Sequence, residues 1–468
     1  MGTAILYSLL AINAAVSFFR PWIGVVGAYL VAILAPQDIW WWLFSDLRPF
    51  FWVILPTLAG FGIAALRGQV DFAFFRTRVN ACVAILWISA VLAYYFGPYV
   101  NVVNEWRFYD PQFMFGIFQK TYLTYFVGVA LLNDSRKLKF GALVLVITTV
   151  YMTYWANAQY FLYHKYGRLH GPTTLSGTGI YADENNFAVL FVVGFPFLYY
   201  FGQYLKSRLL QWSLWPVILF SWHAVFLTAS RGALLGIGSV LLLFSLRLER
   251  KTFGILIIAA FVGAFVWQAG DVMKSRSATI TDYEEEDSAM GRIEAWEASS
   301  GMMAAHPLTG VGFASFGQAF PDFSDKRPRV AHNTFFQIGG EWGVIAGITY
   351  LTLLFSTINR LRKNGNRLRQ LARQTDNPGN ENRLYLCINE ACLLGLTGFF
   401  VCSMFLSLQG YEVFYYLLVL ANATLVCSSL RSEPAAAAAA NARPRLPLAL
   451  RGRAQPALEK KLLPGIRP

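Results

Sequence analysis

The segment LLQWSLWPVILFSWHAVFLTASRGALLGIGSVLLLFSL, residues 209–246, contains only one residue of the Asp, Glu, Lys and Arg group, Arg231. This arginine separates two apolar runs, 209–230 and 232–246. A membrane-spanning helix needs about 20 apolar residues, so the first run alone is long enough to cross a bilayer. The segment therefore predicts two adjacent membrane helices that meet at Arg231.

The same pattern extends along the whole chain of 468 residues, of which 56% are hydrophobic and 14% charged. Soluble domains carry about 25% charged residues, so a water-soluble fold is excluded. Runs without Asp, Glu, Lys or Arg occupy 1–19, 21–37, 49–66, 79–104, 121–133, 140–164, 185–205, 209–230, 232–246, 252–270, 342–359, 391–411 and 413–430. We predict an all-α polytopic membrane protein with 12 or 13 transmembrane helices, depending on whether the first two runs form two helices or one broken helix.

Basic residues predict the orientation of these helices. The net charge of +13 is concentrated in 359–384 and in the tail 431–468, and basic residues mark cytoplasmic loops. We assign the charge to topology and expect no nucleic-acid partner. The C-terminus is then cytoplasmic, and the loops 163–186 and 271–333 face the other side.

The predicted organisation has four parts. Residues 1–270 form the first ten spans and include the loop at 163–186. Residues 271–333 form a large, partly helical periplasmic loop. Residues 334–430 form the last three spans, and 431–468, rich in Ala, Pro and Arg, form a disordered tail.

Three residues on the outer side break the positive-inside pattern. Arg231 precedes a short run of 15 residues that draws it towards the bilayer, where an ionisable side chain indicates function; alternatively, it anchors the helix at the interface. Arg168 lies in a loop rich in Gly and Thr, either as part of an anion site or as a plain surface arginine. That loop ends at Asn185 or Asn186, either of which is a plausible helix N-cap.

His332 precedes a predicted helix start at Asn333 or Thr334. A helix N-terminus favours anions, and a neutral imidazole can accept a proton near pH 7; alternatively, His332 only lies at the water interface. Arg292 begins a helix-like stretch in the large loop and is a further ligand candidate. Glu341 follows His332 in the chain, and we expect it to be a buried partner of an arginine.

The outer-side motifs SRGALLG (230–236), RIEAW (292–296), HPLTGVGFASF (306–316) and AHNTFFQIGGEWGVIAG (331–347) occur in this order. Together they resemble the O-antigen ligase and polymerase superfamily, over about residues 163–358. RPWIGVVGAYLVAILAPQ (20–37) and ADENNFA (182–188) further resemble the O-glycosylation ligases associated with exosortase A.

The resemblance implies a GT-C-type glycosyltransferase of the bacterial inner membrane that is inverting and metal-independent and needs no cofactor. It implies a donor glycan on undecaprenyl diphosphate and an acceptor hydroxyl on a glycan, lipid or protein at the periplasmic face. By motif, Arg231 and Arg168 are catalytic diphosphate ligands and His332 is the base. Arg292 and Glu341 are assigned to substrate binding.

These residue types suit that chemistry. Guanidinium groups bind a diphosphate bidentately and stabilise the charge that grows as the glycosidic bond breaks, and a histidine can deprotonate the acceptor. Two alternatives stay open. One is a repeat-unit polymerase of the same superfamily, and the other is a polysaccharide or lipid transporter, although transporters carry such groups at the midplane and often show inverted repeats.

Overall fold

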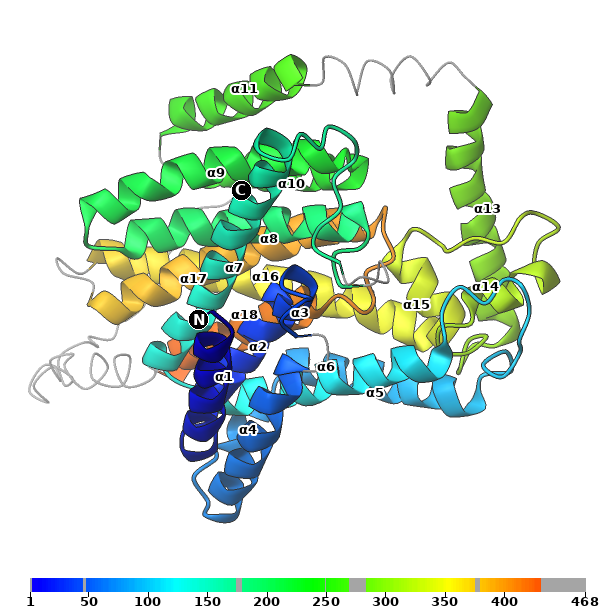
Figure 1. The fold of residues 1–468 in the computed structure, drawn as a ribbon, viewed down its shortest axis with the longest axis horizontal. Helices are drawn as coiled ribbons and strands as arrows, with labels where there is room; N and C mark the ends of the chain where they lie inside the picture. The colour runs from blue at the N-terminus through cyan, green and yellow to red at the C-terminus, as the bar shows by residue number, and fades with distance from the viewer. Residues whose placement is uncertain are drawn as a thin grey trace, which may run out of the picture. The chain divides into compact units, whose positions relative to one another are not determined.

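The computed structural model describes residues 2–44, 48–173, 179–248, 250–268, 283–374 and 379–430, and every regular element in these ranges is a helix (Figure 1). The α-helices are α1 (Gly2–Phe19), α2 (Pro21–Leu34), α3 (Pro36–Ile39), α4 (Pro49–Leu66), α5 (Arg78–Phe96), α6 (Pro111–Leu131), α7 (Ser135–Phe161), α8 (Glu184–Tyr204), α9 (Arg208–Thr228), α10 (Arg231–Arg247), α11 (Lys251–Gln268), α13 (Tyr283–Ala305), α14 (Phe316–Ala319), α15 (Thr334–Trp342), α16 (Val344–Gln374), α17 (Asn380–Ser403) and α18 (Glu412–Leu430). Two short 3₁₀ helices, η1 (Phe72–Phe75) and η3 (Phe320–Asp322), complete the set. The predicted tail 431–468 lies outside the described residues.

Each apolar run of the sequence contains a helix, so the all-α polytopic fold is confirmed. Within the described residues, nine helices are long and apolar enough to span a membrane. The other apolar runs form α1, α6, α10 and α11, which do not meet that criterion. The count of 12 or 13 spans therefore stays a prediction.

Polar residues between the apolar runs define where helices begin. Side-chain oxygens accept hydrogen bonds from backbone N–H groups in the first turns of α5, α6, α7, α8 and α9, which an apolar residue could not do. These N-caps are Thr77, Asp110, Asp134, Asp183 and Ser207.

The most buried of the membrane-length helices are α8, α17 and α18. In an apolar stretch of 18 residues in each, 78%, 78% and 83% of the residues lie inside the protein. α17 packs against α8, α10 and α16. Gly236 of α10 makes one of these contacts possible, because a Cβ there would lie 2.3 Å from the Cys402 sulfur of α17. A glycine at this position lets the two helices approach closely.

A buried ion cluster ties α10, α16 and α17 together near the end of α10. The Glu390 carboxylate is 1% exposed, and it accepts hydrogen bonds from Arg247 Nε at 2.6 Å and from an Arg369 guanidinium nitrogen at 2.9 Å. Gly365 leaves room for it, since a Cβ there would lie 2.3 Å from a Glu390 oxygen. Glu390 is thus a structural group that joins these helices and is not one of the candidate site residues.

The chain from α13 to α15 forms a small substructure with its own buried apolar cluster, which includes Met302, Phe316 and Phe320. α13 packs against α15, as Figure 1 also shows. The helix that follows His332 is not itself a span, because α15 has nine residues and crossing a bilayer takes about 20. α15 ends at Trp342. Gly343 follows with a backbone φ of 92°, which glycine adopts without strain, and the membrane-length helix α16 begins at Val344.

Candidate active site

The break between α9 and α10 places Arg231 at a helix N-terminus. Ala229 adopts a left-handed conformation with φ 51° and ends α9. Ser230 then caps α10, where its Oγ accepts from Ala233 N at 3.4 Å and donates to Asn185 Oδ1 of α8 at 2.8 Å. Arg231 is therefore the first residue of α10, exposed, beside the first turn of α8.

The loop after α7 brings Arg168 to the same break. Leu169 N donates to Leu227 O at 3.0 Å, and Arg168 Nε lies 3.5 Å from Thr228 O. An Arg168 guanidinium nitrogen also lies 3.5 Å from Glu184 Oε1, and the two side chains are 37% and 25% exposed. Such an exposed pair contributes little to stability, so it orients Arg168 more than it stabilises the fold.

The chain before α15 is held in a fixed shape around His332, whose backbone φ is 47°. Asn333 caps α15, as one of the two predicted alternatives had it, and its Oδ1 accepts from Phe335 N at 3.0 Å. Asn333 Nδ2 donates to Met404 O at 3.2 Å. A left-handed conformation is strained for a non-glycine residue and is often retained at functional sites.

The segment 404–406 links the starts of α10 and α15. Thr334 Oγ1 donates to Leu406 O at 2.7 Å, on the α15 side. On the α10 side, a Cβ on Gly232 would lie 3.1 Å from Phe405 Cβ. Arg231 directly precedes Gly232, and His332 lies two residues before Thr334, so these contacts bring both side chains to the same region.

Electrostatics connect these residues further. Burial lowers the pKa of Arg292, and the Arg231 guanidinium lowers it too. The side chain of His332 is exposed on one side, but the protein removes part of its hydration on the other. This desolvation lowers the pKa of the imidazole below its usual value of 6.5, and the charges of Arg292 and Arg329 lower it too. The charge of Asp183 acts in the opposite direction. Both effects require Arg231, Arg292 and His332 to share one neighbourhood.

α13 fixes the loop that carries His332. Trp296 Nε1 donates to Ala331 O at 2.9 Å, and its ring stacks on Phe336 with centroids 5.4 Å apart. Ser299 Oγ donates to Phe336 O at 2.7 Å. Arg292 lies one helical turn before Trp296 and so on the same face of α13.

Glu341 lies behind this loop and is 3% exposed. The expectation of an arginine partner is wrong: Glu341 Oε1 accepts from Gln337 Nε2 at 2.9 Å and from Phe316 N at 3.4 Å. Gln337 Oε1 in turn accepts from Ala331 N at 2.9 Å, directly before His332, and from Ser407 Oγ at 3.1 Å. Glu341 is thus connected to His332 through Gln337 and the backbone.

The structure adds four charged residues to the predicted set, Asp183, Glu184, Glu294 and Arg329. Asp183 caps α8, where its Oδ1 accepts from Asn185 N and Asn186 N at 2.8 and 3.0 Å, so the predicted cap at Asn185 or Asn186 is wrong. Glu184 pairs with Arg168, and an Arg329 guanidinium nitrogen lies 3.7 Å from Glu294. The sequence could have identified Asp183 as the N-cap of α8, since Asp caps helices as well as Asn does.

In the ranges that the structure describes, no group of three His, Cys, Asp or Glu side chains is placed to hold a metal ion. The side chains that gather at this end of the helices include four arginines, the imidazole of His332 and the acidic groups that accompany them. Such a set suits an anionic ligand and a proton transfer.

The fold and this site define a polytopic helical membrane protein with a cationic, histidine-containing site at one end of its helices. Residues 216–351 match the family model described as O-antigen ligase. This match confirms the resemblance to the O-antigen ligase superfamily and supports a membrane enzyme of the glycosyl-transferring kind. It includes Arg231, Arg292, His332 and Glu341, whereas Arg168 precedes it.

No curated protein matches the chain. The narrower resemblance to the ligases associated with exosortase A stays a prediction.

Proposed function

We propose that the protein transfers a glycan from undecaprenyl diphosphate to an acceptor hydroxyl at the periplasmic face of the bacterial inner membrane. The family match supports glycosyl transfer, and the apolar helices support a multi-pass membrane location. The basic segment 359–384 supports a cytoplasmic side opposite the site. The undecaprenyl diphosphate donor is what the family resemblance implies, and the arginines of the site suit its diphosphate group.

The observation that carries this proposal is the gathering of arginines around one imidazole. Arg231 and Arg168 both lie at the α9–α10 break, and Arg292 is close enough to influence His332. A diphosphate is a dianionic or trianionic group that guanidinium forks bind bidentately. In this proposal Arg168 and Arg231 bind the diphosphate, and Arg292 adds a third cation.

The reaction then proceeds by direct displacement. The bond between the sugar anomeric carbon and the phosphate oxygen breaks, and that carbon forms a new bond to the acceptor oxygen from the opposite face. The acceptor proton goes to the His332 imidazole, and undecaprenyl diphosphate leaves with the electron pair. The configuration at the anomeric carbon inverts because the acceptor attacks from the face opposite the leaving group. The arginines stabilise the growing negative charge of the leaving group, and this step uses no metal ion.

The lowered pKa of His332 supports its role as base, because the imidazole is then neutral near pH 7 and free to accept a proton. Glu341 is buried, so we propose that it acts through Gln337 to position His332 and does not touch substrate. This revises its expected place among the substrate-binding residues.

The test is glycan transfer by purified protein in liposomes, with lipid-linked donor and acceptor supplied. We expect Arg231→Ala and His332→Ala each to reduce transfer at least about 100-fold with unchanged thermal unfolding. Arg107→Ala is the matched control, since Arg107 pairs with Asp110 at 3.4 Å and lies in the loop after α5, which contacts the α13–α15 segment through the Tyr99–Val311 hydrogen bond. Near-normal transfer by either site variant would reject the site.

The same assay separates the ligase from the polymerase alternative. A ligase needs a distinct acceptor, whereas a polymerase lengthens lipid-linked repeat units when these are the only substrate. We expect no lengthening without acceptor. Longer lipid-linked chains in that reaction would favour the polymerase.

A further inference from the structure

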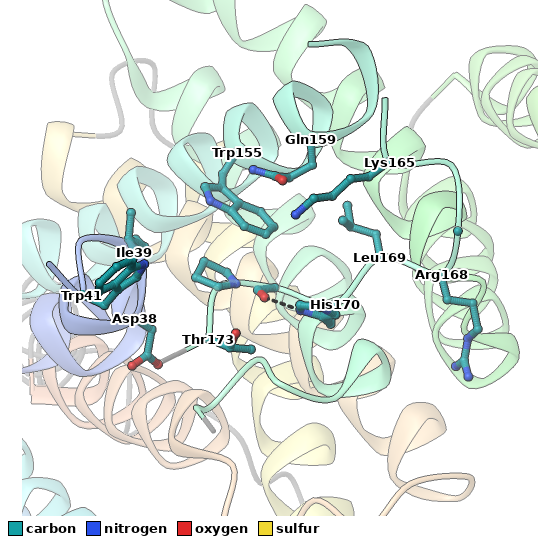
Figure 2. A pocket seen from close by; sticks show the side chains of 13 residues that line it. Asp38, Ile39, Trp41, Trp155, Gln159, Lys165, Arg168, Leu169, His170 and Thr173 are labelled. Atoms are coloured by element: carbon teal, nitrogen blue, oxygen red, sulfur yellow. Dashed lines mark hydrogen bonds between the residues drawn. The ribbon is translucent and has the colours of Figure 1, made fainter. Parts of the chain in front are cut away.

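A second feature of this end of the molecule is a pocket of about 450 Å³, within the size range of small-ligand sites. It lies between α3, the end of α7 and the loop 163–173 (Figure 2). Trp155 and Gln159 of α7 are four residues apart and so share a helix face. Figure 2 shows both side chains beside Lys165, with Trp41 and Asp38 on the other wall.

The lining of this pocket combines two indole rings with an amide, a carboxyl, an ammonium and an imidazole group, the last from His170. Asp38 is 5% exposed, and Gly179 makes room for it, because a Cβ there would lie 2.6 Å from Asp38 Oδ2. A lipid tail would require a continuous apolar wall, which the polar side chains of this lining interrupt. A sugar fits both parts, since its C–H face stacks on an indole and its hydroxyls bond to the amide and the carboxylate.

Arg168 connects the pocket to the candidate active site. It borders the pocket, but its guanidinium extends away from the other lining side chains (Figure 2), towards Glu184 and Thr228 O. A sugar in the pocket would therefore lie on one side of Arg168, and a diphosphate held by the guanidinium on the other.

We propose that this pocket binds a sugar unit of the donor glycan. The inference rests on the proposed function, in which Arg168 holds the diphosphate to which that glycan is joined. In the proposed function the acceptor hydroxyl lies beside His332. His332 does not line this pocket, so we assign the pocket to the donor and not to the acceptor. Trp41, Trp155, Gln159 and Asp38 are then donor-recognition residues.

The experiment compares Trp41→Ala and Gln159→Ala with wild-type protein in liposomes, with donor and acceptor varied in turn. We expect the KM for the donor to rise about three- to tenfold, with kcat and the KM for the acceptor unchanged. Trp42→Ala is the matched control, because Trp42 is adjacent, 61% exposed and not part of the lining. A change confined to the KM for the acceptor, or no change at all in a folded variant, would overturn the proposal.

A binding measurement separates this proposal from the function itself. The probe is the free glycan released from the donor by mild acid, observed by saturation-transfer NMR with detergent-solubilised protein. We expect saturation transfer with wild type and with Trp42→Ala, and its loss with Trp41→Ala. Equal signals for all three would reject the pocket even if Arg231→Ala abolishes transfer. A wild-type protein that binds the glycan through Trp41 but transfers nothing would instead reject the proposed function.

Discussion

Replacement of Gln337 by leucine tests whether the buried network behind His332 positions the imidazole. Gln337 is 2% exposed, and it joins Glu341 to the Ala331 N–H through hydrogen bonds of 2.9 Å each. Leucine has a similar size but no polar atoms. The variant leaves the Ala331 N–H and the Glu341 carboxyl group without this partner, at a cost of about 1–3 kcal/mol for each group.

That cost favours a shifted loop in which Ala331 finds another hydrogen-bond partner. A shift of about 1 Å at a catalytic group reduces a rate about 100-fold, and the whole contribution of a general base is about 10²–10⁴. We therefore expect Gln337→Leu to lower kcat about 100-fold, no more than His332→Ala does. The KM for the donor should stay unchanged, because Arg168, a proposed diphosphate ligand, is held at the α9–α10 break by Glu184 and Thr228 O.

The assay is steady-state transfer in liposomes, combined with thermal unfolding to identify variants that fail to fold. Gln318→Leu is the matched control: Gln318 is also buried at 3% exposure, in α14, and its side-chain nitrogen has no hydrogen-bond partner among the described residues. A folded Gln337→Leu protein with wild-type kcat would refute the positioning role. An increase in donor KM alone would also contradict it.

Two further predictions concern pH and stability. The pKa of His332 is lowered by partial loss of hydration and by Arg292, so its base form is lost only as pH falls through a value below 6.5, and the acidic limb of kcat/KM should lie there. In a pH–rate profile, Arg292→Ala should move that limb to higher pH and Asp183→Asn should move it to lower pH. A limb that stays in place in both variants would contradict this assignment. Glu390→Ala leaves two arginines of the α10–α16–α17 cluster without their carboxylate, which should destabilise the fold by about 3–5 kcal/mol; thermal unfolding in detergent would show a lower midpoint, and an unchanged midpoint would count against the cluster as a structural tie.

The helices were predictable because a bilayer requires every backbone polar group to be bonded within its segment. That demand is local in sequence, so charge-free runs such as 140–164 and 185–205 indicate α7 and α8 directly. Helix starts were less predictable. Asp183, Asn185 and Asn186 are all competent caps, and the side chain of Asn185 instead accepts from Ser230, a contact over 45 residues that no local pattern contains.

The candidate site was likewise predictable in its individual residues but not in the contacts that bring them together. Each of Arg168, Arg231 and His332 could be selected from the sequence, because a charged or titratable group beside an apolar run is unusual. Their proximity depends on contacts such as Leu169–Leu227 and Thr334–Leu406, which join segments far apart in the chain. The partner of Glu341, by contrast, is local: Gln337 lies four residues earlier on the same helix, where side chains are neighbours, and it could have been identified from the sequence.

The positions of the charged groups along their helices bear on the transporter alternative. Transporters place their ionisable groups at breaks in the middle of membrane helices, and the α15–α16 break at Gly343 has that appearance. Glu341, the carboxylate two residues before this break, is however hydrogen-bonded to Gln337 and to Phe316 N. Arg231 is the first residue of its helix, and Arg168 and His332 lie in loops. Groups at helix ends suit a reaction at the membrane surface, where a lipid-anchored diphosphate and a water-exposed hydroxyl can meet, better than they suit passage through the bilayer.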